Sequence, residues 1–70
     1  MVESILLNNN FIYQHTLNET EKWYVKGSYS VMYNESDKHL IVYCINDIIL
    51  EYQDDQLKEI TNINEQFSKL

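Results

Sequence analysis

The sequence predicts an α+β fold: an antiparallel five-stranded β-meander with one C-terminal amphipathic α-helix packed on one face of the sheet. Apolar and polar residues alternate across residues 21–33, which is the period of a strand with one buried side. Near the C-terminus, apolar residues instead recur at steps of three and four, as on one side of a helix. We expect a chain of 70 residues to form one domain, residues 1–70.

The first two strands are predicted at residues 2–7 and 11–17, which are apolar-rich runs. The three asparagines between them, residues 8–10, predict a hairpin turn because asparagine tolerates a left-handed backbone. The polar triplet at residues 18–20 predicts the next turn.

The third strand, residues 21–33, divides into a face expected to be buried and a face expected to be exposed. Gly27 falls on the buried face, where a missing side chain permits a bend. A strongly bent, barrel-like sheet is therefore the alternative to an open meander. Tyr24 and Met32 fall on the exposed face. The face expected to be buried consists of Trp23, Val25, Gly27, Tyr29, Val31 and Tyr33.

The last two strands are predicted at residues 39–45 and 48–53, with Asn46-Asp47 as a two-residue turn between them. A five-residue loop, residues 34–38, precedes them and pairs Tyr33 with His39. A four-residue loop would move the apolar residues of one strand to the other face, because a one-residue slip reverses every side chain. We therefore favour the five-residue loop.

A helix is predicted at residues 55–68. Its apolar residues fall within an arc of roughly 140° at 100° per residue, which is one face of an amphipathic helix. Asp54 and Asp55 supply an N-cap and a favourable charge at its N-terminus. A helix of ~14 residues is marginal alone, so we expect it to dock on the sheet. The apolar face comprises Leu57, Ile60, Ile63, Phe67 and Leu70.

The charge of the chain limits its partners. Eleven acidic residues against five lysines give a net charge of -6, and the chain contains no arginine. Phosphate and base recognition depend on arginine forks and basic stripes, so we expect no direct contact with nucleic acid. The overall field also repels anionic membranes. The expected partner is a protein with a basic surface.

We predict no catalytic site, cofactor or metal. Cys44 is the only cysteine, it lies inside a predicted strand, and it reads as a small buried hydrophobe. His15 and His39 lack the paired spacing of zinc ligands. A single glycine cannot form a phosphate-binding loop. We therefore interpret the chain as non-enzymatic.

The location expected from the sequence is the cytoplasm. One unpaired thiol fits a reducing compartment, and the sequence contains neither a signal peptide nor an apolar run of membrane-spanning length. Asn, Ile, Tyr and Lys are abundant, whereas Ala, Pro and Arg are absent. This usage favours AT-rich codons and indicates a low-GC bacterium or one of its phages. For a phage protein, the location would be the host cytoplasm.

The predicted function is that of a small acidic binding protein encoded by a phage or mobile element. It would inhibit a larger host nucleic-acid-handling or defence protein by occluding a basic surface. One alternative is a structural accessory protein that forms a homodimer, and the other is a small-ligand-binding module with an aromatic-lined cavity under the helix. The residues predicted to contact the partner are the carboxylates Glu35, Asp37, Glu51, Asp54 and Asp55, with Tyr24 and Met32 as exposed anchors.

Overall fold

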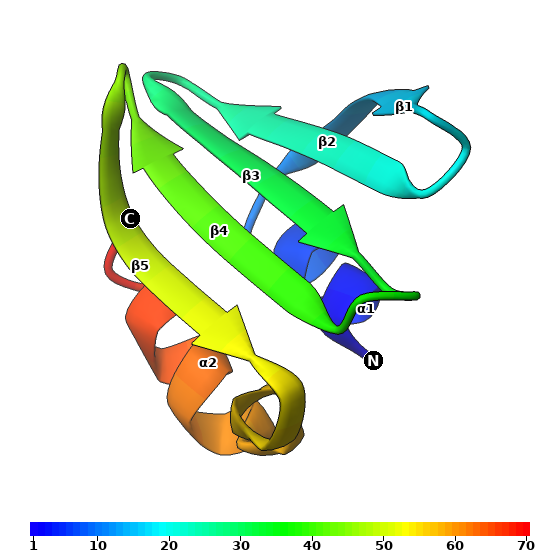
Figure 1. Ribbon diagram of the computed structural model, residues 1–70. Helices are drawn as coiled ribbons and strands as arrows, with labels where there is room; N and C mark the ends of the chain where they lie inside the picture. The colour runs from blue at the N-terminus through cyan, green and yellow to red at the C-terminus, as the bar shows by residue number, and fades with distance from the viewer.

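The computed structural model describes residues 1–70 and shows an α+β fold in two layers (Figure 1). One antiparallel sheet has the strand order β1-β2-β3-β4-β5, and both helices lie behind it, covering one face. This confirms the predicted α+β class and the five-stranded antiparallel sheet. The sheet is open rather than a closed barrel, with β1 and β5 at its edges. The strands are β1 (Ile12–Leu17), β2 (Glu21–Lys26), β3 (Tyr29–Asn34), β4 (His39–Cys44) and β5 (Asp47–Gln53).

The N-terminal segment is helical, so the strand predicted at residues 2–7 is wrong. Helix α1 (Val2–Asn8) buries Val2, Ile5 and Leu6; Ile5 and Leu6 come three and four residues after Val2, which places all three on one helix face. The sequence contained this spacing, but the run is too short and too continuously apolar for periodicity alone to separate helix from strand. The N-terminal segment therefore contributes a second helix to the core, beside the helix at the C-terminus.

The three asparagines end α1 instead of forming a hairpin turn. Asn9 is the C-cap, and Asn10 adopts a φ of 71°. The Phe11 N–H then donates to the Leu6 carbonyl at 3.0 Å, and the same carbonyl accepts from the Asn9 N–H at 3.2 Å, so the last turn of the helix is closed by backbone hydrogen bonds. Asparagine does adopt a left-handed backbone here, as predicted, but Asn10 does so at the end of a helix and not in a hairpin turn.

The strand predicted at residues 21–33 is a hairpin of two strands. Lys26 pairs with Tyr29, which leaves Gly27 and Ser28 as a two-residue loop. Gly27 has a φ of 57° whereas the φ of Ser28 is not positive, and a positive φ at the first loop position alone is the mark of a type II′ turn, in which glycine is preferred. The loop shifts the alternation by one residue, so Tyr24 of β2 lies on the same face as Val31 of β3.

The β3–β4 loop has four residues, so the predicted five-residue loop is also wrong. Asn34 pairs with His39, and Tyr33 pairs with Leu40. The predicted register assumed that His39, Ile41 and Tyr43 face the helices. In the structure these three residues face the opposite side, because Leu40 and Val42 are the fully buried members of β4.

The β4–β5 turn lies one residue earlier than predicted. Cys44 pairs with Asp47, so the loop is Ile45 and Asn46 rather than Asn46 and Asp47. A register irregularity then brings Tyr43 opposite Ile48 while Val42 lies opposite Leu50. The extra residue of this bulge is Ile49, which allows the strand to keep its apolar residues in place despite the shifted turn.

The predicted continuous helix at residues 55–68 is broken in two. A 3₁₀ helix, η1 (Asp54–Lys58), is followed by the α-helix α2 (Ile60–Phe67), with Glu59 at the junction. Gln53, not an aspartate, caps η1 by exchanging hydrogen bonds with Gln56. The predicted apolar face is nevertheless the face that packs on the core, through Leu57, Ile60, Ile63, Phe67 and Leu70.

The core lies between the helices and one face of the sheet. α1 contributes Leu6, α2 contributes Ile63 and Phe67, and the rings of Phe11 and Phe67 meet at 5.6 Å. The sheet supplies Tyr24, Val31, Tyr33, Leu40, Val42 and Tyr52 to this layer. No helix covers the opposite face, which we call the open face (Figure 1).

Candidate interaction surfaces

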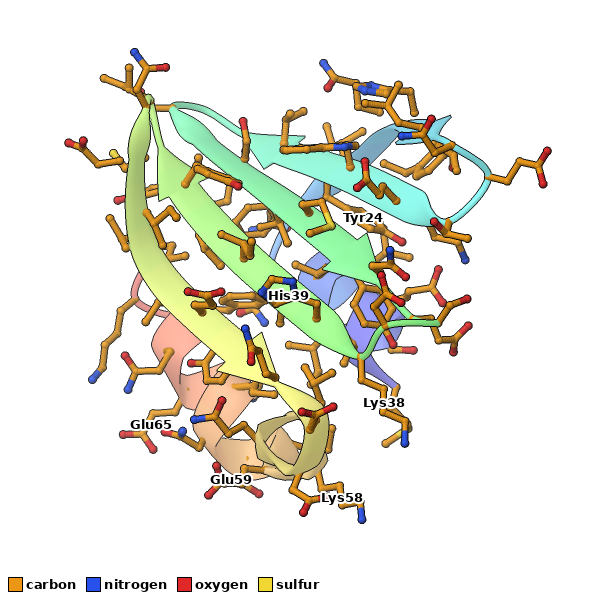
Figure 2. All side chains as sticks on the ribbon, in the orientation of Figure 1. Tyr24, Lys38, His39, Lys58, Glu59 and Glu65 are labelled. Atoms are coloured by element: carbon orange, nitrogen blue, oxygen red, sulfur yellow. The ribbon has the colours of Figure 1, made fainter.

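The structure brings the turn carboxylates and the carboxylates of η1 to one end of the molecule. The Asp54 N–H donates to the Lys38 carbonyl at 2.9 Å, which joins the β3–β4 loop to the start of η1. The labelled side chains of Lys38 and Lys58 lie at this end of the molecule in Figure 2. We call this surface the acidic end and define it by the exposed residues Glu35, Asp37, Asp54 and Asp55.

Local hydrogen bonds hold part of the acidic end in place. The Asp37 N–H donates to the Asn34 side-chain oxygen at 3.0 Å, and the Asn34 amide donates back to the Asp37 carboxylate at 3.2 Å. Asp55 lies 3.3 Å from the Lys58 ammonium, within one turn of η1. Both groups of that pair are largely exposed, so the pair contributes little to stability.

A pocket of about 300 Å³ opens at the acidic end. Its polar side chains include two carboxylates, Glu35 and Asp54, and two lysines, Lys38 and Lys58, so these charges balance. Its apolar wall comes from Met1, Val2, Tyr33 and Leu57. Tyr33 is the single aromatic residue of this pocket. This pocket therefore differs from the aromatic-lined cavity under the helix that the ligand-binding alternative predicts.

Glu51 does not join the acidic end but lies on the open face. Its carboxylate is 2.7 Å from Nε2 of His39, and the Gln53 amide donates to the same carboxylate at 3.3 Å. The hydrogen bond with His39 lowers the pKa of Glu51 below its usual value. In Figure 2 the His39 ring lies in front of the sheet, on the side away from the helices.

Tyr24 is buried, so its predicted role as an exposed anchor is wrong. Only 3% of the residue is exposed, because the Gly27-Ser28 loop turns β2 over relative to the predicted strand. The Tyr24 hydroxyl and the Lys22 ammonium both donate to the Glu3 carboxylate at 3.0 Å. Burial raises the pKa of Tyr24, and the hydrogen bond from Lys22 lowers that of Glu3. This network fixes α1 to the sheet.

Met32 is also mostly buried, with 8% exposed, but it lies on the open face beside Trp23 and Ile41. The Trp23 ring stacks at 5.9 Å on Tyr43 and at 6.3 Å on His15. Nε1 of Trp23 is buried and has no hydrogen-bond partner, so packing contacts rather than a hydrogen bond position the indole. The centre of the open face is therefore an aromatic and aliphatic cluster that spans β1 to β4.

The open face carries carboxylates but no lysine. Within the strands, Glu21 and Glu51 lie on this face, in register with Asn34 and Ile41 respectively. The two strand lysines lie on the helix side: Lys22 bonds Glu3 of α1, and the Lys26 ammonium sits 5.7 Å from the Phe11 ring centre. Alternation along β2 thus separates the lysines from the open face.

Sequence reasoning missed the open face because it placed Trp23 on the helix side. The signal that identifies it is the Gly27-Ser28 pair, since glycine followed by serine is typical of a two-residue hairpin turn. A turn at that point inverts the assignment of β2 and assigns Trp23 and Val25 to the uncovered side. The most exposed apolar residues at the two edges of that side, Ile12 and Ile48, are 68% and 55% exposed.

The chemistry-bearing side chains remain apart. His15 lies on β1, and His39 and Cys44 lie at opposite ends of β4. No three His, Cys, Asp or Glu side chains converge in a way that could hold a metal ion. Neither α1 nor α2 has the length and apolar character to cross a membrane.

Fold and surfaces together define a small α+β protein with a helix-covered sheet, an uncovered aromatic sheet face and an acidic end. No protein-family model, curated protein or solved structure matches the chain.

Proposed function

We propose that this chain is a non-enzymatic binding protein that covers a basic surface of a larger nucleic-acid-handling or defence protein and so inhibits it. The observation that carries the proposal is the adjacency of Glu35 and Asp37 to Asp54 and Asp55 at the acidic end, joined by the hydrogen bond from Asp54 to Lys38. Carboxylates grouped in this way can take the place of phosphates on a surface that binds nucleic acid.

The negative net charge of the chain supports a basic partner. The net charge of -6 without arginine favours association with cationic surfaces and accelerates the encounter at low salt. The pocket at the acidic end presents two carboxylates and two lysines, which are groups suited to ionic contacts with a protein partner.

The AT-rich residue usage supports a phage or mobile element as the source and a host protein as the target. A small inhibitor made in the host cytoplasm needs only a stable surface and no cofactor. An 8.4 kDa chain with one charged end meets that requirement.

The acidic end is tested by the double substitution Asp54→Asn and Asp55→Asn. We expect immobilised wild-type protein to retain a nucleic-acid-handling protein from host lysate at low salt and to release it near 1 M salt, where screening acts over ~3 Å. The double variant should bind the purified partner about tenfold more weakly, and should inhibit its activity correspondingly less, because two carboxylates of the contact are neutral. Binding is measured by calorimetry and inhibition by the activity of the partner.

The matched control is the double substitution Glu19→Gln and Glu65→Gln, which removes two exposed charges at the β1–β2 turn and on α2. We expect this control to change the affinity by less than about twofold at moderate salt. Equal losses in the two double variants would mean that net charge, not the acidic end, drives binding. Retention of no such partner at low salt would contradict the proposed function.

A further inference from the structure

We propose that the open face is the anchoring surface of this binding protein and that it docks on an apolar protrusion of the partner flanked by lysine or arginine side chains. The inference rests on the proposed function and names the chemistry of the partner's contact. Its basis is an apolar centre around Trp23 and Tyr43 with carboxylates at its margin and no lysine.

The open face has the area of a small interface. Five strands spaced ~4.8 Å apart, each of about six residues rising ~3.3 Å, make a surface of roughly 24 by 20 Å. A domain buries each apolar sheet face under a second layer, and here the helices supply that layer on one side only. An apolar face left in this state marks a docking surface.

The anchors of the open face are held rigid before binding. Trp23 is stacked between His15 and Tyr43, and Met32 and Ile41 are mostly buried beside it. Aromatic and methionine side chains in a fixed arrangement dominate the energy of protein interfaces, because little side-chain entropy is lost on binding. Exposed Ile12 and Ile48 extend this apolar surface to the two edges of the sheet.

The charges decide between a foreign partner and a second copy of the chain. A face-to-face dimer would bring two copies of Glu21 into one interface with no lysine between them, whereas Glu51 is already paired with His39 in each copy, and each copy carries a net charge of -6. Like charges across an interface oppose association. A cationic partner is attracted by the same carboxylates that repel a second copy of the chain. Charge complementarity therefore favours a cationic partner over a homodimer.

The test uses the peptide Lys-Lys-Leu-Phe-Leu-Lys-Lys, whose inner lysines lie ~13 Å apart when extended, close to the ~14 Å from β2 to β5. Trp23 is the only tryptophan, so its fluorescence reports directly on the open face. We expect the peptide to shift Trp23 emission saturably, whereas heptalysine, which lacks apolar residues, should leave that emission unchanged.

Two substitutions of equal exposure locate the binding. Ile48→Lys places a cation on the open face, and Leu7→Lys places one on α1; both wild-type residues are 55% exposed, so both variants should fold. We expect Ile48→Lys to raise the Kd of the peptide about tenfold or more, and Leu7→Lys to change it less than twofold. Ile12→Lys, at the other edge, should act like Ile48→Lys.

Three results would overturn the inference. The first is no change in Trp23 emission with the peptide, and the second is equal binding by the Ile48 and Leu7 variants. The third is light scattering showing a dimer that Ile48→Lys dissociates and Leu7→Lys does not, because a second copy would then cover the face. None of these results would affect the salt-dependent capture of a partner from lysate or its sensitivity to Asp54 and Asp55. The inference about the open face and the proposed function can therefore fail independently.

Discussion

The Glu3 carboxylate shows how one side chain connects two layers of this protein. It accepts hydrogen bonds from Lys22 and Tyr24 of β2, although it belongs to the first turn of α1. The hydrogen bond from Lys22 lowers the pKa of Glu3 from 4.5, and the same contact raises the pKa of Lys22 from 10.5. Glu3 also lies where the helix dipole favours negative charge.

The contribution of Glu3 to stability should depend on pH. A carboxyl group whose pKa is lowered on folding stabilises the protein above its unfolded pKa and loses that effect as the pH falls through its folded pKa. Glu3→Gln should lower the Tm by about 2 °C at pH 7, a small effect because the pair is half-exposed. The difference from wild type should shrink at pH 3, as followed by circular dichroism on heating.

Glu19→Gln, at the exposed β1–β2 turn, is the control and should change the Tm little at either pH. An equal loss for Glu3→Gln at pH 3 and pH 7 would show that packing of the side chain, not its charge, joins α1 to the sheet. The raised pKa of Lys22 sets the upper end of the pH range in which the pair stabilises the protein. The stabilising effect of the pair is lost as the pH rises through the pKa of Lys22 in the folded protein.

The two tight turns of the sheet use the same backbone conformation with different residues. Gly27 and Ile45 each occupy the first position of a two-residue loop with a φ near 60°, at 57° and 59°. The Ile45 N–H also donates to the Ser28 carbonyl at 3.0 Å, so the two turns support one another. Glycine adopts this conformation freely, whereas a β-branched residue is strained in it.

Ile45→Asn should therefore stabilise the protein. Asparagine tolerates a left-handed backbone, and Ile45 is 74% exposed, so little packing is lost. We expect the free energy of unfolding to rise by about 1 kcal/mol in urea denaturation.

Ile48→Asn makes the same substitution in β5, where φ is not positive, and should give no increase. A loss of stability in Ile45→Asn would show that the isoleucine side chain contributes packing that outweighs its backbone strain. The exposed isoleucines of this turn and strand would then be structural rather than available for a partner.

At the element scale, the C-terminal apolar face could be predicted from sequence because its period is local. The faces of β2 and β4 were assigned wrongly, because each depends on a turn. The Gly27-Ser28 turn was missed, and the β3–β4 loop is one residue shorter than predicted; these two errors reversed the environment expected for Tyr24, His39 and Tyr43.

The whole molecule depends on the contact between its two terminal segments and the sheet. Phe11, which follows α1, meets Phe67 of α2, and Asn9 donates to Asn64 at 2.9 Å. Neither helix exceeds eight residues, so neither is stable without this docking. The core therefore forms as a unit.

Phe67→Ala should destabilise the protein by about 3–5 kcal/mol, because Phe67 is fully buried and its loss leaves a cavity. That is a large share of the total free energy of unfolding, which is about 4–10 kcal/mol for 70 residues at ~0.05–0.15 kcal/mol per residue. Chemical denaturation followed by Trp23 fluorescence measures it. Asn62→Ala, exposed on the same helix, should have little effect, because alanine favours a helix more than asparagine does. A loss comparable to that of Phe67→Ala would show that burial of the side chain does not set the cost.

The charge of the molecule is distributed unevenly, and this distribution connects the fold to the proposed binding. Alternation in β2 directs Lys22 and Lys26 toward the helices, while Glu21 remains on the open face. The acidic end adjoins that face where His39 begins β4 directly after the β3–β4 loop.

The sequence by itself determined the α+β class, the amphipathic C-terminal face and the acidity without arginine, since these follow from composition and local periodicity. Only the tertiary structure decided that residues 2–8 are helical, that Tyr24 is buried, and that Trp23 and Tyr43 form an uncovered cluster. A short apolar run fits either helix or strand until the surface it packs on exists. A strand's buried face, likewise, is set by turns whose lengths the strand's own pattern does not contain.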